Sequence, residues 1–161
     1  RHCHRMKYFA VTAFLGLLAY LAWPFYHVWQ LNQAVVAGDR ASLSRLVDLP
    51  RVKIEINKKL NKEVDSVVGE VSSSFVRWLQ EGIHRLGNDA VERLVTLDWV
   101  EAQLLAGSPA GRQEGFLAQV SYAFFDGLDR FRVRIGDPAD TPVHIHMRLQ
   151  GGHWPVIAVY H

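Results

Sequence analysis

The feature that most constrains this chain is a long, uncharged and largely apolar run over residues 8–29, close to the N-terminus. The run contains no Asp, Glu, Lys or Arg, and it directly follows the basic residues Arg1, Arg5 and Lys7. A helix needs about 20 predominantly apolar residues to cross the hydrocarbon core of a bilayer. Because the run has no polar face, the core helix of a soluble protein is a weaker interpretation. We expect a transmembrane anchor.

The flanks of this run predict its orientation. Trp23, Tyr26, His27 and Trp29 lie at its end, and amphipathic rings of this kind settle at the headgroup level of a membrane. Basic residues beside a first segment favour the cytoplasmic side. We therefore expect a single-pass protein of the bacterial inner membrane, with a cytoplasmic N-terminus and the remainder in the periplasm.

A cleaved signal peptide is the main alternative, because it too has a basic start and an apolar middle. The small-residue cleavage pattern around residues 19–22 is interrupted by Tyr20 and Leu21, and Trp23 and Pro24 follow. The run is also long for the apolar region of a signal peptide. An uncleaved signal anchor is the interpretation that these residues favour, with Met6 as an alternative start of the chain.

Composition limits what the rest of the chain does. Residues 1–30 form the predicted tip and anchor, and residues 31–161 are enough for one exported domain. Without the three basic residues of the tip, 15 Lys and Arg face 16 Asp and Glu, so the domain is nearly neutral and does not resemble a nucleic-acid binder. Cys3 is the only cysteine, which excludes an intramolecular disulfide and a cysteine-based metal cluster.

The first half of the domain is predicted to be helical. Gly38 and Asp39 provide a helix stop and an N-cap for a short helix over residues 40–47, and Pro50 is expected to break the chain. A long helix with a single apolar stripe is then expected from Arg51 onward. Its apolar residues recur every three or four positions: Ile56, Leu60, Val64, Val67, Val71, Phe75, Trp78 and Leu79. Thr96 is expected to cap a helix over residues 97–106.

The second half changes to a period of two. Four alternating segments are separated by turn residues, among them Asp126-Gly127 and Gly151-Gly152, and this pattern predicts four antiparallel strands in a meander. The side chains expected to face the core are Ala118, Val120, Tyr122 and Phe124, then Phe131, Val133 and Ile135, then Val143, Ile145, Met147 and Leu149, and finally Trp154, Val156, Ala158 and Tyr160. The predicted fold class is α+β: one N-terminal transmembrane helix, then several helices packed on a C-terminal four-stranded antiparallel sheet.

Several segments together resemble a known family. They are Trp23-Pro24-Phe25-Tyr26, Leu31-Asn32-Gln33-Ala34 with Gly38-Asp39 and Leu43, Val47-Asp48-Leu49-Pro50-Arg51-Val52, Leu94-Val95-Thr96, and a closing strand with Trp154. The chain resembles a bacterial family of uncharacterised membrane-anchored proteins, the domain of unknown function numbered twenty-nine thirty-nine. The resemblance is expected to cover nearly the whole chain. It implies an architecture and a location, and it supplies no catalytic residue because the family has no assigned activity.

The polar face of the predicted sheet has the most distinctive charge pattern in the chain. Basic residues alternate with apolar ones on two neighbouring strands: Arg130, Arg132, Arg134, His144, His146 and Arg148. If the strands pair, these six side chains form one cationic docking face, suited to an acidic subunit, a lipid headgroup or another anionic ligand. The alternative is a solvated sheet face that discourages aggregation at the edge.

Catalytic and metal-binding motifs are poorly supported. His144 and His146, with His153 or His161, have a spacing that suits a metal, but arginines surround them, and a cation is unfavourable there. No nucleophile elbow or phosphate-binding loop occurs, and Ser72-Ser73-Ser74 is expected on a helix. We expect no enzyme activity and no cofactor.

The sequence leaves two kinds of function open. The preferred hypothesis is a non-catalytic accessory subunit of a larger bacterial membrane complex, whose anchor contacts the complex and the bilayer through Ala13, Gly16, Ala19, Tyr20 and Trp23. The alternative is a membrane-tethered binding module for a lipid or another apolar or anionic small molecule. Its pocket would lie between helices and sheet and be lined by Phe75, Trp78, Trp99, Phe124 and Trp154.

Overall fold

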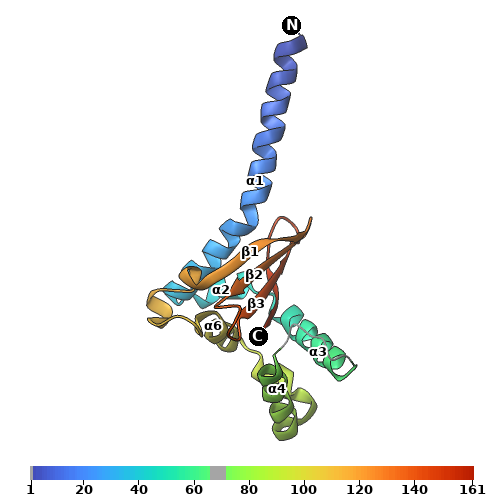
Figure 1. The fold of residues 1–161 in the computed structure, drawn as a ribbon, viewed down its shortest axis with the longest axis vertical. Coiled ribbons are helices and arrows are strands. Elements are labelled where there is room, and N and C mark those ends of the chain that lie inside the picture. Colours follow the sequence, from blue (N-terminus) through green and yellow to red (C-terminus); the bar gives the residue numbers. More distant parts are fainter. Residues whose placement is uncertain (1, 66–71) are drawn as a thin grey trace.

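A single long helix projects from a small domain of further helices and one sheet. The computed structural model describes residues 2–65 and 72–161. Helix α1 (His2–Ala37) stands free over most of its length, and its C-terminal part enters the domain (Figure 1). The chain is therefore organised around one continuous helix that belongs both to the predicted anchor and to the folded domain.

The change of environment along α1 follows from its sequence. Between His2 and Trp23 every described side chain is exposed, whereas Val28, Leu31 and Val35 are buried. These three residues recur at steps of three and four and therefore form one apolar stripe on the helix. Pro24 lies inside α1, and the helix continues through it.

Short local signals end α1 and start the next helix as predicted. Gly38 has a φ of 66°, a left-handed conformation that suits glycine, and its backbone N–H donates to the Val35 carbonyl. The Asp39 side chain then accepts a hydrogen bond from the Ser42 backbone N–H at 3.1 Å. Asp39 is therefore the N-cap of α2 (Arg40–Leu46).

Two predictions about the following helices are wrong. Pro50 does not break the chain, because it lies in the first turn of α3 (Leu49–Asp65), where a missing N–H costs no hydrogen bond. The single long helix is also replaced by two. Ser72 accepts a hydrogen bond from the Phe75 backbone N–H and caps a new helix, α4 (Ser73–Leu86). The middle of the expected stripe, including Val67 and Val71, lies outside the described residues.

The remaining helical elements are short. A 3-10 turn, η1 (Gly87–Asp89), leads into α5 (Ala90–Leu94), and α6 (Leu97–Leu105) follows. Thr96 caps α6 as predicted, since its hydroxyl accepts a hydrogen bond from the Trp99 backbone N–H at 3.2 Å. Two more 3-10 turns, η2 (Gly111–Gln113) and η3 (Leu117–Gln119), connect α6 to the sheet.

The predicted meander is confirmed. Strands β1 (Val120–Gly127), β2 (Arg130–Ile135), β3 (Val143–Arg148) and β4 (Val156–Tyr160) pair antiparallel in the order of the chain. With the helices first and the sheet last, the fold is α+β, as predicted.

The prediction of which side chains of β1 face the core is wrong. Tyr122 and Phe124 were expected inside, but they pair with Arg134 and Arg132, and they are 42% and 56% exposed. An irregularity in the pairing after Val120 places them on the basic face of the sheet. The alternate residues Ala123 and Phe125 pack against the core instead.

Strand β4 is buried on both of its faces. Ala158 and Tyr160 were expected in the core, and both belong to it, although they pair with His146 and His144 on the basic face of the sheet. They are nevertheless buried, at 5% and 1% exposure, because α3 packs against β4. Every residue of β4 is therefore apolar or aromatic although the strand lies at an edge of the sheet.

Candidate functional site

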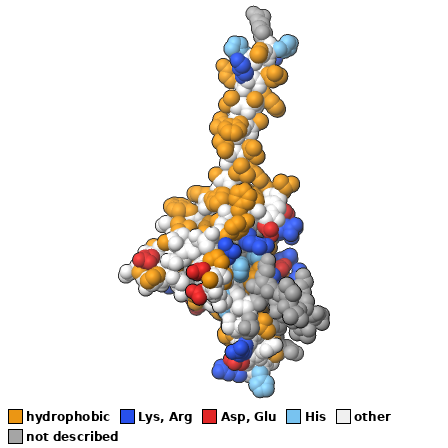
Figure 2. All heavy atoms as spheres, in the orientation of Figure 1, with side chains coloured by type: hydrophobic (Ala, Val, Ile, Leu, Met, Phe, Trp, Pro, Cys, Tyr) orange, Lys and Arg blue, Asp and Glu red, His pale blue; other side chains and the backbone are white. Residues whose placement is uncertain are grey.

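The projecting part of α1 is the most distinctive surface of the molecule. Within the described residues, α1 is the one helix that is long and apolar enough to cross a membrane, and only 6% of its most apolar stretch is buried. Figure 2 shows hydrophobic side chains around this projecting length, with basic and histidine side chains at its far end. The composition and the exposure are those of a membrane-spanning helix or a signal anchor.

The base of this projection is attached to the sheet by side-chain contacts. The Tyr20 hydroxyl donates a hydrogen bond to the Leu128 carbonyl in the β1–β2 turn. The Trp23 Nε1–H donates to the Gly152 carbonyl in the β3–β4 turn at 2.9 Å. The Tyr20 ring also stacks on Phe125, with ring centroids 5.9 Å apart. Two turns of the sheet therefore lie beside the helix at the level where it leaves the domain (Figure 1).

These contacts divide the predicted anchor residues into two groups. Tyr20 and Trp23 contact the chain's own domain, whereas Ala13, Gly16 and Ala19 lie on the projecting part and are exposed. A Cβ atom added at Gly16 would meet nothing within 4 Å. The contact of these small residues with a partner stays a prediction.

The predicted aromatic belt surrounds the base of the projection. Trp23, Tyr26 and Trp29 are each about half exposed, and the rings of Tyr26 and Trp29 stack with centroids 5.9 Å apart. His27 differs from them, because it is 5% exposed and its Nδ1 lies 3.1 Å from the Trp23 carbonyl oxygen. The rings of Trp23, Tyr26 and Trp29 are therefore exposed beside α1, whereas the His27 ring is buried.

The six residues of the predicted cationic docking face lie together on one side of the sheet. Strands β2 and β3 pair so that three cross-strand couples form, and these are Arg130 with Arg148, Arg132 with His146, and Arg134 with His144. Side chains directly opposite each other on one face of an antiparallel pair are close neighbours. The face is thus built as the sequence pattern required, while its binding of an acidic partner stays a prediction.

Neighbouring groups of the same domain engage much of this face. Arg132 donates to the Asp126 carboxylate at 3.1 Å, and Asp129 lies 3.8 Å from Arg130 and 3.6 Å from Arg148. The Arg134 Nε–H donates to the Ser121 hydroxyl at 3.1 Å. Part of the positive charge is therefore balanced within the hairpins, most of all near the β1–β2 turn.

The histidines that could have formed a metal site do not converge. His146 lies 2.7 Å from the Tyr160 hydroxyl, whereas His161 lies 3.1 Å from the Ser72 hydroxyl and His153 faces His27 near α1. Within the described part of the chain, no group of three or more His, Cys, Asp or Glu side chains is arranged to hold a metal ion.

The aromatic rings considered for a ligand pocket separate into two places. Trp78 stacks on Trp99 with centroids 5.5 Å apart, and Phe75 packs beside both. Trp154 instead contacts the rings of the β1–β2 hairpin and is 1% exposed, while Phe124 is exposed. Four of these rings stabilise the core at two points, Phe124 lies outside the core, and the five do not line one cavity.

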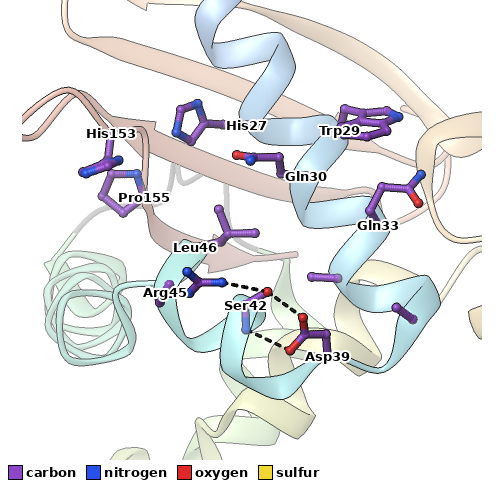
Figure 3. Close-up of a pocket in the computed structure, with 12 residues that line it drawn as sticks. His27, Trp29, Gln30, Gln33, Asp39, Ser42, Arg45, Leu46, His153 and Pro155 are labelled. Atoms are coloured by element: carbon purple, nitrogen blue, oxygen red, sulfur yellow. Dashed lines mark hydrogen bonds between the residues drawn. The ribbon is translucent and has the colours of Figure 1, made fainter.

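A cleft lies at a different position, between α1, α2 and the segment that precedes β4. Its volume is about 700 Å³. Figure 3 shows His27 and Gln30 of α1 on one wall and His153 and Pro155 on another, with Arg45 and Leu46 of α2 below. This cleft was not predictable from the sequence, because its walls come from segments more than one hundred residues apart.

A small polar network forms the floor of the cleft. Ser42 donates its hydroxyl to Asp39 at 2.6 Å and accepts a hydrogen bond from Arg45 at 3.0 Å (Figure 3). The hydrogen bonds from the Ser42 side chain and backbone lower the pKa of the Asp39 carboxyl. This network also caps α2, so its arrangement has a structural reason independent of any ligand.

Two buried polar contacts that the sequence did not predict fix α1 and α6 in the domain. The Asn32 side-chain oxygen accepts a hydrogen bond from the Phe116 backbone N–H at 2.8 Å, and both residues are buried. Glu101, 8% exposed, pairs with Arg112 of η2. Both contacts join α1 or α6 to the segment that leads into the sheet.

A family model described as a protein of unknown function, DUF2939, matches residues 13–103, which is more than half of the chain. The chain belongs to this family. No curated protein and no solved structure matches it.

The extent of the DUF2939 match is informative. It begins within the projecting part of α1, continues through α5, and ends within α6. The anchor and the helices that follow it are thus parts of one family unit. The match ends before the four strands, whereas the resemblance was expected to extend to Trp154.

Proposed function

We propose that this DUF2939 chain is a non-catalytic accessory subunit of a larger bacterial membrane complex. In this proposal α1 spans the inner membrane once, Arg1, Arg5 and Lys7 keep the N-terminus in the cytoplasm, and the domain lies on the periplasmic face. The observation that carries the proposal is the attachment of the domain to its helix. Tyr20 and Trp23 bind two turns of the sheet, and the same helix supplies Leu31 and Val35 to the core.

A fixed attachment suits a subunit better than a tethered enzyme or carrier. A domain that searches for a substrate needs a flexible linker, and Gly or Ser residues are typical of such linkers. Here no linker separates the apolar segment from the domain, because α1 runs without interruption from one into the other. The domain is therefore held at one height and orientation above the membrane, as a lateral partner of a fixed assembly requires.

Two surfaces are available for the complex in this proposal. The projecting helix has the small residues Ala13, Gly16 and Ala19 toward one side, and small residues let helix backbones approach closely in lipid. The cationic docking face of β2 and β3 adds a surface outside the membrane for an acidic neighbour. Asp126 and Asp129 partly balance the arginines near the β1–β2 turn, whereas Arg134 at the other end donates to the neutral Ser121 hydroxyl.

A substitution in the anchor tests the proposal. Gly16→Leu adds bulk where the chain itself has open space, so the isolated protein should stay folded while close packing with a partner helix is lost. Chromatography of membranes solubilised in a mild detergent should show the wild-type chain with a larger complex and the Gly16→Leu chain as a smaller species. Leu18→Met, on the opposite side of the helix, is the matched control and should migrate like the wild type. A wild-type chain that elutes only as a free monomer would count against an accessory subunit.

The cleft beside α1 favours a second candidate function, a membrane-tethered binding module. About 700 Å³ is enough for a lipid headgroup or another small molecule, and the amides, His27 and Arg45 on its walls offer hydrogen bonds. Native mass spectrometry of the full chain in detergent distinguishes the two functions. A copurifying small molecule that is lost from Gln30→Leu supports the module, while an empty chain with a large protein partner supports the subunit.

A further inference from the structure

The projecting part of α1 is too short to cross a bilayer before it reaches the sheet. The uncharged run begins at Tyr8, after Lys7, and its first hydrogen bond to the domain is made by Tyr20. Twelve residues at 1.5 Å each advance the helix by about 18 Å. The hydrocarbon core of a typical bilayer is about 30 Å thick. The stretch above the first contact is therefore about 12 Å short.

The direction of the Tyr20 side chain makes the stretch before the first contact shorter still. Side chains on a helix lean toward its N-terminus, so the Tyr20 hydroxyl lies on the membrane side of its own Cα. The carbonyl that accepts its hydrogen bond belongs to Leu128, in the turn between β1 and β2. The tip of this hairpin is thus at the depth of Tyr20 or deeper. An extended Lys7 side chain recovers only a few ångströms at the other end.

The length of the full uncharged run does match the thickness of the hydrocarbon core. From Tyr8 to Trp29 the helix advances about 32 Å, close to the thickness of the core. The belt rings Tyr26 and Trp29 then lie at the outer membrane–water interface, where such rings are favoured. Residues 20–29 would therefore lie in the outer half of the membrane and also contact the domain.

The chemistry of the hairpin tip fits this position. Leu128 is 86% exposed, which makes it the most exposed large hydrophobic side chain among the described residues, although most leucine side chains are buried. Arg130 and Arg148 stand directly behind it as a cross-strand pair, and Asp129 lies within 4 Å of both. An apolar tip followed by arginines places a leucine toward the acyl chains and guanidinium groups toward lipid phosphates.

We propose that the β1–β2 turn is a second membrane-contacting element, with the Leu128 side chain inserted into the outer leaflet and Arg130 and Arg148 at its phosphates. This inference rests on the proposed spanning of the membrane by α1. The occupant of the exposed tip is the lipid bilayer itself, because the tip continues the surface of the spanning helix to which Tyr20 binds it. The domain then contacts the membrane at two points, which restricts its tilt relative to the membrane.

Fluorescent probes at three positions test the inference. In a Cys3→Ser full-length chain, single cysteines at Leu128, Leu15 and Asp140 are labelled with an environment-sensitive dye, and the protein is placed in phosphatidylethanolamine–phosphatidylglycerol vesicles. Leu15 reports on the anchor, and Asp140 is an exposed residue in the β2–β3 turn, at the opposite end of the strands. We expect blue-shifted emission and quenching by a lipid-borne quencher at Leu15 and Leu128, and emission typical of water at Asp140.

The three probes distinguish failure of the inserted tip from failure of the membrane span. If Leu15 is in lipid while Leu128 behaves like Asp140, the inserted tip is wrong and the anchor stands. If Leu15 is also in water, α1 does not span the bilayer and both proposals fall. Leu128→Asp supplies a second measurement, since the side chain is exposed and its replacement leaves the core intact. A probe beside the tip, made as Asp129→Cys with and without Leu128→Asp, should move toward water when the charged tip is present, and no change would overturn the inference.

Discussion

The buried hydrogen bond between Asn32 and Phe116 gives a quantitative prediction about what holds α1 in the domain. In Asn32→Ala the Phe116 backbone N–H loses its acceptor, and Phe116 is fully buried, so water cannot replace the lost oxygen. A buried donor left without a partner costs about 1–3 kcal/mol. Alanine has the higher helix propensity and returns roughly 0.5 kcal/mol. We expect the free energy of unfolding to fall by about 0.5–2.5 kcal/mol.

Gln33 offers a matched control for this substitution. It is the next residue of α1 and carries the same amide group, but its side chain is exposed. Gln33→Ala should leave the free energy of unfolding unchanged or raise it by a few tenths of a kcal/mol. The difference between the two variants therefore isolates the buried hydrogen bond from the gain in helix propensity.

Urea unfolding of the full chain in detergent micelles measures the effect, with tryptophan fluorescence as the signal because Trp154 is buried in the core. The midpoint should fall for Asn32→Ala with an unchanged slope, since the surface exposed on unfolding stays the same. If Asn32→Ala and Gln33→Ala unfold at the same urea concentration, the hydrogen bond does not stabilise the junction of helix and sheet. The proposed fixed attachment would then depend on apolar packing alone.

Two further predictions concern the same junction and the far end of the sheet. Gly115→Ala should destabilise the fold by about 2 kcal/mol or more in thermal unfolding, because Gly115 has a φ of +69° and the new Cβ would lie 2.1 Å from the Asn32 side-chain oxygen. Gly107→Ala is the control and should be close to neutral, because the new Cβ would meet nothing within 4 Å. An equal loss of stability in both variants would contradict the reasoning. Burial lowers the pKa of His161 below its usual value of about 6.5, so the unfolded chain takes up a proton first and the free energy of unfolding should fall as the pH drops below about 6.5. His161→Phe should reduce this pH dependence in urea titrations at pH 5 and 7, and an unchanged pH dependence would contradict the reasoning.

Local signals in the sequence predicted the elements whose causes are local. Asp39 and Thr96 cap helices because their side chains reach backbone N–H groups three residues away. The turn at Gly151-Gly152 joins β3 to β4 because both glycines adopt a positive φ, of 56° and 79°. The long apolar helix α1 was predictable for the same reason, since its length and its lack of charge are properties of one continuous segment.

The faces of the outer strands were not predictable from alternation. In β1 both alternate sets are apolar, with Tyr122 and Phe124 in one and Ala123 and Phe125 in the other, so the period of two selects neither. The irregular pairing with β2 decides between them, and that pairing is a property of two strands. Strand β4 is apolar at every position because a helix covers its second face, a tertiary feature that no pattern within the strand reveals.

The contacts that attach the domain to the anchor escaped prediction because they join distant parts of the chain. Tyr20 and Leu128 are 108 residues apart, Trp23 and Gly152 are 129 apart, and Asn32 and Phe116 are 84 apart. From the sequence alone, the aromatic rings at the end of the apolar run were interpreted as a membrane belt. That interpretation is incomplete, because Trp23 and Tyr20 also donate hydrogen bonds to backbone carbonyls of the sheet.

If α1 spans the membrane as proposed, the fixed attachment gives the cationic docking face a direction relative to the bilayer. Arg130 and Arg148 stand at the end of β2 and β3 next to the turn that Tyr20 binds, while Arg134 and His144 lie four residues further along. Four residues of a strand span about 13 Å. If the turn touches lipid, the first couple lies at the phosphates and the last couple lies beyond them. A lipid and an acidic subunit would then bind different ends of one face, so Arg130→Gln should weaken contact with anionic vesicles, whereas Arg134→Gln should weaken only the contact with the protein partner.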